Sequence, residues 1–392
     1  MLSLYNTLNG AVEPVDTTTG SVSLYVCGVT PYDTTHLGHA FTYVAFDVLV
    51  RYLRSSGVRV RYAQNVTDID DDILRKAKER QMPYDELAKV ETARFVADMR
   101  ALNVLEPDHF IPATSVMERI VEAVSKLLGE GSAYSSGGNI YFDNTTFPGY
   151  GAPIRDRQTM VQLASEHGGN PEDPNKRDPL DFLLWQKHAP GEPSWPSPFG
   201  PGRPGWHIEC STIALTELGI PVDIHGGGSD LIFPHHASEI AQAETITHDY
   251  PFVRHWMHTA MVRMDGEKMS KSLGNMVFVG ELLKAFPADA IRLYLLSHHY
   301  REPFEWDLAG LTEMDELCAR LREFGANSED SDDDDLSREF RDAMDDDLHA
   351  DRVVEALVEL SARDEIAKLK SAAAWAAPIL GLTFQETMAV PA

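Results

Sequence analysis

The sequence is poor in cysteine and has no long apolar run, and each shortage excludes a class of protein. Three cysteines (Cys27, Cys210 and Cys318) among 392 residues are too few and too scattered for a disulfide framework. We therefore expect a cytoplasmic location with free thiols that can bind metal. No stretch of about eighteen apolar residues suits a membrane span, and the N-terminus lacks the basic region and apolar core of a secretory signal.

Positive charge is also scarce. Lysine and arginine together number 34 against 61 aspartates and glutamates, which gives a formal net charge of −27. Such a balance opposes attraction to a polyanion and provides no overall basic footprint for nucleic acid. It lowers the expectation of a large tRNA-binding surface, although an acidic protein can still carry a local basic patch.

The order of apolar runs and helical periodicity predicts an α/β fold with a parallel sheet. A β-branched run at 22–26 precedes a periodic helix at 41–52, and a second strand at 58–64 leads into another helix. A strand at 222–225 resumes the pattern. We divide the chain into four parts: the first half of a catalytic sheet domain (1–102), a connective insertion (103–204), the second half of the sheet domain (205–275) and a C-terminal helical bundle (276–392).

Three further expectations concern single segments. The insertion is expected to hold a short strand pair around 134 and 140–142, and loops rich in proline and glycine from there to 204. A last strand of the sheet is expected at 255–262. The acidic run at 328–335 is expected to be a solvated linker.

A turn at the end of the first strand holds the first candidate site. The pattern His36-Leu37-Gly38-His39 follows this strand and opens the first helix. The turn amides and the helix N-terminus favour an anion such as phosphate, and Gly38 lets the backbone come close to a ligand. His36 and His39 lie on one helical turn and can stabilise charge that grows on a phosphate. On its own, this pattern is more often helix capping or packing.

A second pattern far downstream gives the first one its weight. Lys268-Met269-Ser270-Lys271-Ser272 is a KMSKS sequence. An early HxGH with a late KMSKS is the paired signature of class I enzymes that form aminoacyl-adenylates. The alternative for the lysines, a solvated surface loop, is disfavoured by that partner. Gly266 and Gly274 flank the pattern and would let the loop close over ATP.

Two cysteines and a histidine near predicted α/β turns are candidates for a metal site. Cys27, Cys210 and His235 offer two sulfur ligands and one nitrogen, the soft mixture that suits Zn²⁺. Glu239 lies four residues after His235 and is a candidate fourth ligand or outer-shell group. The alternative is two buried free cysteines and an unrelated histidine. A zinc with three protein ligands would bind a substrate thiol as thiolate and reject a serine hydroxyl, which makes cysteine the coherent substrate.

These motifs resemble the cysteinyl-tRNA synthetase superfamily over nearly the whole chain. Within it, the chain is most similar to the ligases that join cysteine to glucosaminyl-inositol in mycothiol biosynthesis. The segment 27–40 carries this resemblance, together with Glu166-His167-Gly168-Gly169-Asn170-Pro171, which looks like the ERGGDP motif of those ligases. His167 and Asn170 depart from that motif, and Glu239 matches the synthetase pattern instead. The short stretch after Ser272 favours the ligase, and cysteine–tRNA ligase is the alternative.

The resemblance implies a fold, a reaction and a set of residues. The fold is a class I synthetase-type Rossmann (HUP-like) sheet with an insertion and a helical bundle. The reaction is ATP-dependent formation of cysteinyl-adenylate, with Mg²⁺ on the phosphates, and transfer of cysteine to the amine of glucosaminyl-inositol with release of AMP and pyrophosphate. One zinc would bind at Cys27, Cys210 and His235, with Glu239 as the candidate fourth ligand. The catalytic residues would be His36, His39, Lys268 and Lys271. Contacts with substrate or adenylate are implied for Cys27, Gly28, Val29, Thr30, Thr42, Asn65, Val66, Thr67, Trp206, Gly228, Ser229, Asp230 and Val262.

Several alternatives stay open at this level. Instead of contacting substrate, Trp206 could be an ordinary core tryptophan. Thr42 could likewise lie on a helix face without contacting a ligand. The base that accepts the proton of the amine is unnamed, and Asp33 is a candidate only by its place in the turn. We expect a monomer that uses small molecules, with tRNA as a partner only under the alternative function. A paralogue that binds zinc or nucleotide without catalysis is disfavoured by the intact histidines and lysines.

Overall fold

A five-stranded parallel sheet forms the centre of the molecule. The computed structural model describes residues 1–33, 35–269, 274–324 and 334–384. The strand order is β11-β10-β3-β4-β5, and every neighbouring pair runs parallel. The strands are β11 (Val253–Thr259), β10 (Val222–Gly228), β3 (Ser21–Val29), β4 (Arg59–Val66) and β5 (His109–Pro112). The predicted α/β class with a parallel sheet is therefore confirmed.

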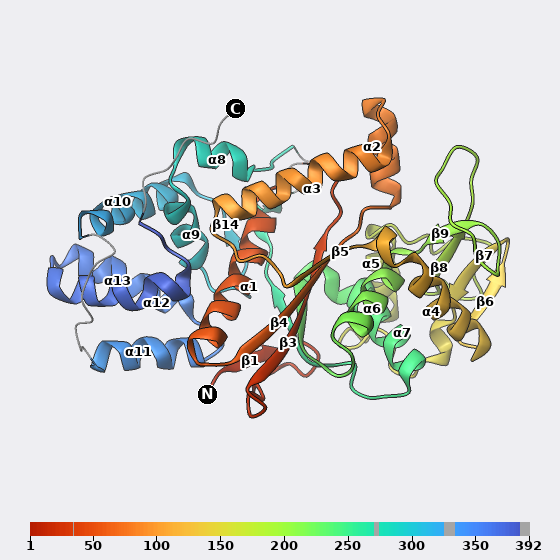
Figure 1. The fold of residues 1–392 in the computed structure, drawn as a ribbon, viewed down its shortest axis with the longest axis horizontal. Helices are drawn as coiled ribbons and strands as arrows, with labels where there is room; N and C mark the ends of the chain where they lie inside the picture. The colour runs from red at the N-terminus through yellow and green to blue at the C-terminus, as the bar shows by residue number, and fades with distance from the viewer. Residues whose placement is uncertain (34, 270–273, 325–333, 385–392) are drawn as a thin grey trace.

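Helices cover both faces of this sheet. Figure 1 shows α1 (Leu37–Ser55) on one side and α6 (Trp206–Glu217) with α7 (Ala237–Thr247) on the other. The apolar core on the α1 side is large and continues into the C-terminal helices, whereas a smaller core lies under α6. Two further helices, α2 (Asp71–Arg80) and α3 (Tyr84–Ala101), connect β4 to β5. Central strand β3 is buried along most of its length because helices pack on both of its faces.

The insertion is a separate antiparallel sheet with two helices, at the end of the molecule opposite the C-terminal helices (Figure 1). The expected strand pair is present as β6 (Ala133–Ser136) and β7 (Asn139–Phe142), with α4 (Met117–Gly129) beside it. The expectation of loops from there to residue 204 is wrong in part. They contain three regular elements: α5 (Arg157–Glu166), β8 (Phe182–Lys187) and β9 (Gly202–Pro204). Because β5 belongs to the main sheet, we propose that the insertion begins after Pro112 rather than at 103.

The C-terminal part is helical, as expected. Its helices are α8 (Val279–Ala285), α9 (Ala288–Leu296), α10 (Leu308–Phe324), α11 (Asp334–Asp345), α12 (Ala350–Ala362) and α13 (Ile366–Leu380). The expected strand at 255–262 is interrupted: β11 ends at Thr259, and Val262 begins β12 (Val262–Met264) of a small sheet with β13 (Glu267–Lys268) and β14 (Phe304–Glu305). Most of the acidic run at 328–335 lies outside the described residues.

A short hairpin begins the chain and packs beside the main sheet. It consists of β1 (Ser3–Asn6) and β2 (Ala11–Pro14), and β1 lies against β11. Among the described residues, no helix combines the length and apolarity that crossing a membrane would need.

Candidate metal and nucleotide site

A buried cluster of cysteine, histidine and glutamate side chains lies where β3 and β10 end. Cys27, Cys210, His235 and Glu239 each offer one ligand atom, and these atoms lie within 4.8 Å of one another. All four side chains are buried. The structure therefore brings together the residues that the sequence proposed for zinc. Three distant segments contribute: Cys27 comes from β3, Cys210 from α6, and His235 and Glu239 from the turn before α7 and from α7 itself.

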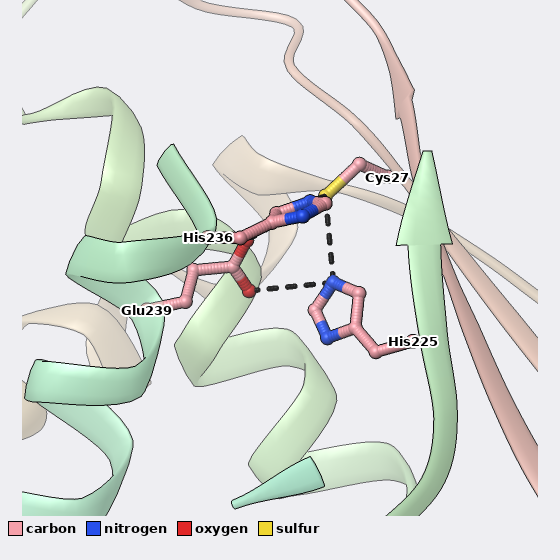
Figure 2. A group of neighbouring side chains, drawn as sticks. All are labelled: Cys27, His225, His236 and Glu239. Atoms are coloured by element: carbon pink, nitrogen blue, oxygen red, sulfur yellow. Dashed lines mark hydrogen bonds and ion pairs between the residues drawn. The ribbon is translucent and has the colours of Figure 1, made fainter. Parts of the chain in front are cut away.

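A second set of ligand atoms shares two members with the first. Cys27, His225, His236 and Glu239 also lie within 4.8 Å of one another (Figure 2). The sulfur of Cys27 is 3.3 Å from Nε2 of His236 and 3.6 Å from Nε2 of His225. The sequence missed His225 and His236. His225 lies at the end of a predicted strand next to a glycine run, and that position is the signal that could have found it.

Glu239 is positioned by helical spacing. It follows His235 by four residues, and Oε1 lies 3.1 Å from Nε2 of that histidine and 3.6 Å from the sulfur of Cys27. Oε2 is buried without a hydrogen-bond partner, and Nε2 of His225 lies 3.6 Å from it (Figure 2). A carboxylate oxygen left in this state is costly unless a cation lies beside it.

Other histidines orient the candidate ligands. Nδ1 of His207 lies 2.9 Å from Nδ1 of His235, which leaves Nε2 of His235 turned to Glu239. On the other side, Nδ1 of His236 lies 2.7 Å from Nε2 of His258. Metal-binding histidines usually engage the second ring nitrogen in this way, because the contact fixes the tautomer and the ring orientation.

Burial sets the protonation of the cluster. It raises the pKa of Cys27, Cys210 and Glu239, and it lowers the pKa of His235 and His236. Desolvation is the main cause in every case, since the charged form of each group loses its water. A bound divalent cation reverses this preference for thiols and carboxylates and suits neutral imidazole. The donor set of soft sulfur, imidazole and one carboxylate fits Zn²⁺.

Gly28 and Asn65 join the ends of β3 and β4 beside this cluster. The amide of Gly28 donates to Oδ1 of Asn65 at 2.7 Å, and Nδ2 of Asn65 donates to Oγ1 of Thr67 at 3.1 Å. A Cβ at position 28 would lie 1.7 Å from the carbonyl oxygen of Asn65, so only glycine fits. Val29 pairs with Val66 after an irregularity in the β3–β4 register. These predicted contact residues thus share one edge of the sheet, where open α/β sheets bind ligands.

The HxGH residues form the start of α1. His36 is the N-cap, and its Nδ1 accepts from the amide of His39 at 3.3 Å. The two imidazole rings stack with their centroids 3.6 Å apart. A Cβ on Gly38 would approach the His36 ring to 3.1 Å. His36 therefore caps the helix in this structure, as the alternative interpretation has it. The rings of His36 and His39 are both half-buried at the helix N-terminus.

The remaining predicted residues lie at several places around these two motifs. Trp206 stacks on His235 with centroids 4.3 Å apart, and Oγ1 of Thr42 lies 2.7 Å from Oγ1 of Thr259. Val262 is buried at the start of β12. Thr30 directly follows β3, and Gly228, Ser229 and Asp230 lie where β10 passes into a short helical turn. Lys268 ends β13, and Lys271 lies outside the described residues.

Comparison with known proteins places the chain in a family. A family model described as the catalytic domain of tRNA synthetases class I (C) matches residues 13–316, so the chain belongs to that family. A methionyl-tRNA synthetase of Mycobacterium tuberculosis, solved with methionyl-adenylate, has the same fold at a TM-score of 0.65. It is 17% identical, and the match covers 92% of this chain and 90% of that one.

Curated relatives narrow the family. The protein called L-cysteine:1D-myo-inositol 2-amino-2-deoxy-alpha-D-glucopyranoside ligase in Acidothermus cellulolyticus is 46% identical, over 92% of this chain and 90% of the relative. The protein of that name in Mycolicibacterium smegmatis is also 46% identical, over 91% and 88%. The chain therefore belongs with these ligases, and the resemblance seen in the sequence is confirmed.

Proposed function

We propose that this protein activates L-cysteine with ATP and joins it to the amine of glucosaminyl-inositol, in mycothiol biosynthesis. The single observation that carries the proposal is the convergence of Cys27, Cys210, His235 and Glu239 beside a nucleotide-type turn. The relatives' names favour an amino sugar over tRNA as the acceptor. We also propose that the protein works in the cytoplasm and as a monomer.

One zinc per chain would be held by Cys27, Cys210 and His235. When bound, zinc supplies an open position where the thiol of cysteine can ionise and bind as thiolate. Glu239 would either complete the protein ligands or hold His235 in place. Stacked on His235, Trp206 would cover the cysteine and exclude water from it.

ATP would bind across the edge formed by β3, β4 and β10, with Mg²⁺ on its phosphates. The start of α1, with His36 and His39, would receive the triphosphate. The carboxylate of cysteine attacks the α-phosphorus, and pyrophosphate leaves. Lys268 and Lys271 are proposed to stabilise the charge that moves onto this leaving group. The amine of the acceptor then attacks the activated carbonyl, and AMP leaves.

The direct test is to mix ATP and cysteine with each acceptor and to detect the product by mass spectrometry. We expect a cysteine amide of glucosaminyl-inositol, and no charging of tRNA. Exchange of labelled pyrophosphate into ATP, dependent on cysteine, reports the first step alone. Charging of tRNA without amide formation would establish the alternative, cysteine–tRNA ligase. A protein that shows neither exchange nor product would be a binding paralogue.

A further inference from the structure

A cavity adjoins the candidate cysteine site on the side of the insertion. It has a volume of about 170 Å³ and lies between the start of α2 and the segment from α5 to β9. Trp206 lines it and also stacks on His235 at 4.3 Å. His207 lines it and contacts His235 through Nδ1. An occupant of this cavity is therefore separated from the candidate zinc ligand His235 by a single side chain.

The walls of the cavity combine charged groups with aromatic rings. Asp70 and Lys176 line it, and so does Arg203, whose buried side chain pairs with Asp71 of α2. The rings of Trp206 and two other aromatic residues, Tyr150 and Phe182, add apolar surface. Carboxylates and cations bind hydroxyl groups in both directions, and ring faces suit the C–H faces of sugars. The lining therefore fits a polyol better than an apolar molecule.

The segment that separates the ligases from the synthetases in the sequence forms part of this wall. His167, Gly168, Gly169 and Asn170 line the cavity directly after α5. A Cβ on Gly169 would lie 2.7 Å from the carbonyl oxygen of Ala164, so glycine lets this turn fold against the end of α5. The turn also faces the cavity.

Asp70 is held at the cavity wall by the helix that it caps. Its Oδ1 accepts from the amides of Asp72 at 2.7 Å and Ile73 at 3.0 Å. Burial raises the pKa of Asp70 to about 6, against which the cap bonds act more weakly. At neutral pH the group is still a carboxylate, and it is a better proton acceptor than an exposed aspartate. Asp33, the candidate base from the sequence, instead pairs with Arg80 at 3.7 Å.

We propose that this cavity binds the acceptor, an amino sugar joined to a polyol, and that Asp70 accepts the proton of the attacking amine. The inference rests on the proposed function. The neutral amine forms a bond to the carbonyl carbon of the adenylate, and its nitrogen gains positive charge. Asp70 takes one N–H proton, the carbon–oxygen bond to the phosphate breaks, and AMP leaves with the electron pair. Water later removes the proton from Asp70.

The test is the variant Asp70→Asn, which removes the charge and keeps a side chain that caps helices equally well. Cysteine-dependent pyrophosphate exchange should stay within about twofold of the wild type, because the first step does not use the cavity. The kcat for amide formation should fall at least about 100-fold, the usual contribution of a general base. Asp156→Asn is the matched control, since Asp156 caps α5 in the same way from an exposed position. It should leave both steps unchanged.

A second variant tests binding without touching a helix cap. Lys176→Gln should raise the acceptor KM roughly 10-fold, with exchange unchanged, because a charged hydrogen-bond donor is lost. Unchanged amide formation in both variants overturns the inference. Loss of exchange in Asp70→Asn also overturns it, because Asp70 then acts in the first step or in folding. A wild-type protein without cysteine-dependent exchange overturns the proposed function itself, whereas intact exchange with unaffected acceptor kinetics overturns the cavity assignment alone.

Discussion

Two groups of buried ionisable side chains in this chain are built on different principles. Asp47 of α1 and Arg292 of α9 are fully buried and lie 2.5 Å apart. Their polar atoms have further hydrogen-bond partners: Arg292 donates to the carbonyl oxygens of Leu102 and Leu380, and Asp47 accepts from the amide of Leu105. This pair is complete without a ligand. It fixes four parts of the chain to one another: α1, the segment 102–105, α9 and the end of α13.

The cluster around Cys27 is equally buried but incomplete. It gathers thiols, imidazoles and a carboxylate. Oε2 of Glu239 has no hydrogen-bond partner. The comparison teaches that burial of charge alone does not mark a site. A site is marked instead by a buried cluster whose own donors and acceptors cannot satisfy one another, because such a cluster needs a bound cation to complete it.

The largest effect is expected where the incomplete cluster is broken. Cys27→Ala should lower cysteine-dependent exchange by more than about 100-fold, the upper limit for loss of a mere outer-shell partner. Bound zinc should fall from one per chain to nearly none by atomic emission. Cys318→Ala is the matched control, because Cys318 is a buried cysteine of α10 remote from the cluster. Full activity with bound zinc in Cys27→Ala would remove the cluster from the mechanism.

Breaking the pair of Asp47 and Arg292 should lower the stability of the protein and leave its catalytic activity unchanged. Arg292→Met leaves the buried Asp47 with Arg51, 2.8 Å away, as its remaining cationic partner, and should lower the free energy of unfolding by up to about 3 kcal/mol, measured in urea. The double variant with Asp47→Leu should recover part of that loss, because no buried carboxylate remains and Arg51 reaches solvent. The folded fraction should keep its exchange rate. A single variant as stable as the wild type would show that the pair contributes nothing.

The two possible ligand sets can be separated through the histidines behind them. His207→Phe removes the contact that orients His235, and His258→Phe removes the one that orients His236. If zinc uses Cys210 and His235, the first variant should bind zinc about 10–100-fold more weakly and the second should bind normally. Competition with a chelator measures both. The reverse order would assign the metal to His225 and His236.

The smallest effect is expected at Thr42. Its hydroxyl bonds Thr259, so Thr42→Val should cost about 1 kcal/mol of unfolding free energy. If Thr42 also touches the adenylate, the KM for ATP should rise several-fold in the exchange assay. An unchanged KM would leave Thr42 as a helix-face residue without a ligand.

The sequence predicts the parallel sheet because β3, β4 and β10 carry β-branched or apolar runs that continue into helices. It does not predict β8 and β9, since these short strands follow proline and glycine turns and depend on pairing, β8 with β7 and β9 with β8. A similar limit applies to the site. Cys27 and Cys210 are 183 positions apart and meet only through the fold. His225 and His236 join them through strand pairing and a turn, which spacing along the chain does not reveal.

The central claim is that the Cys27 cluster holds a metal that selects cysteine by its sulfur. The most direct test replaces the metal with Co²⁺ and follows the absorption spectrum while cysteine or serine is added. A further sulfur-to-cobalt charge-transfer band should appear with cysteine and not with serine, in step with cysteine-only pyrophosphate exchange. A spectrum that cysteine leaves unchanged, or exchange that serine supports equally well, would contradict the account.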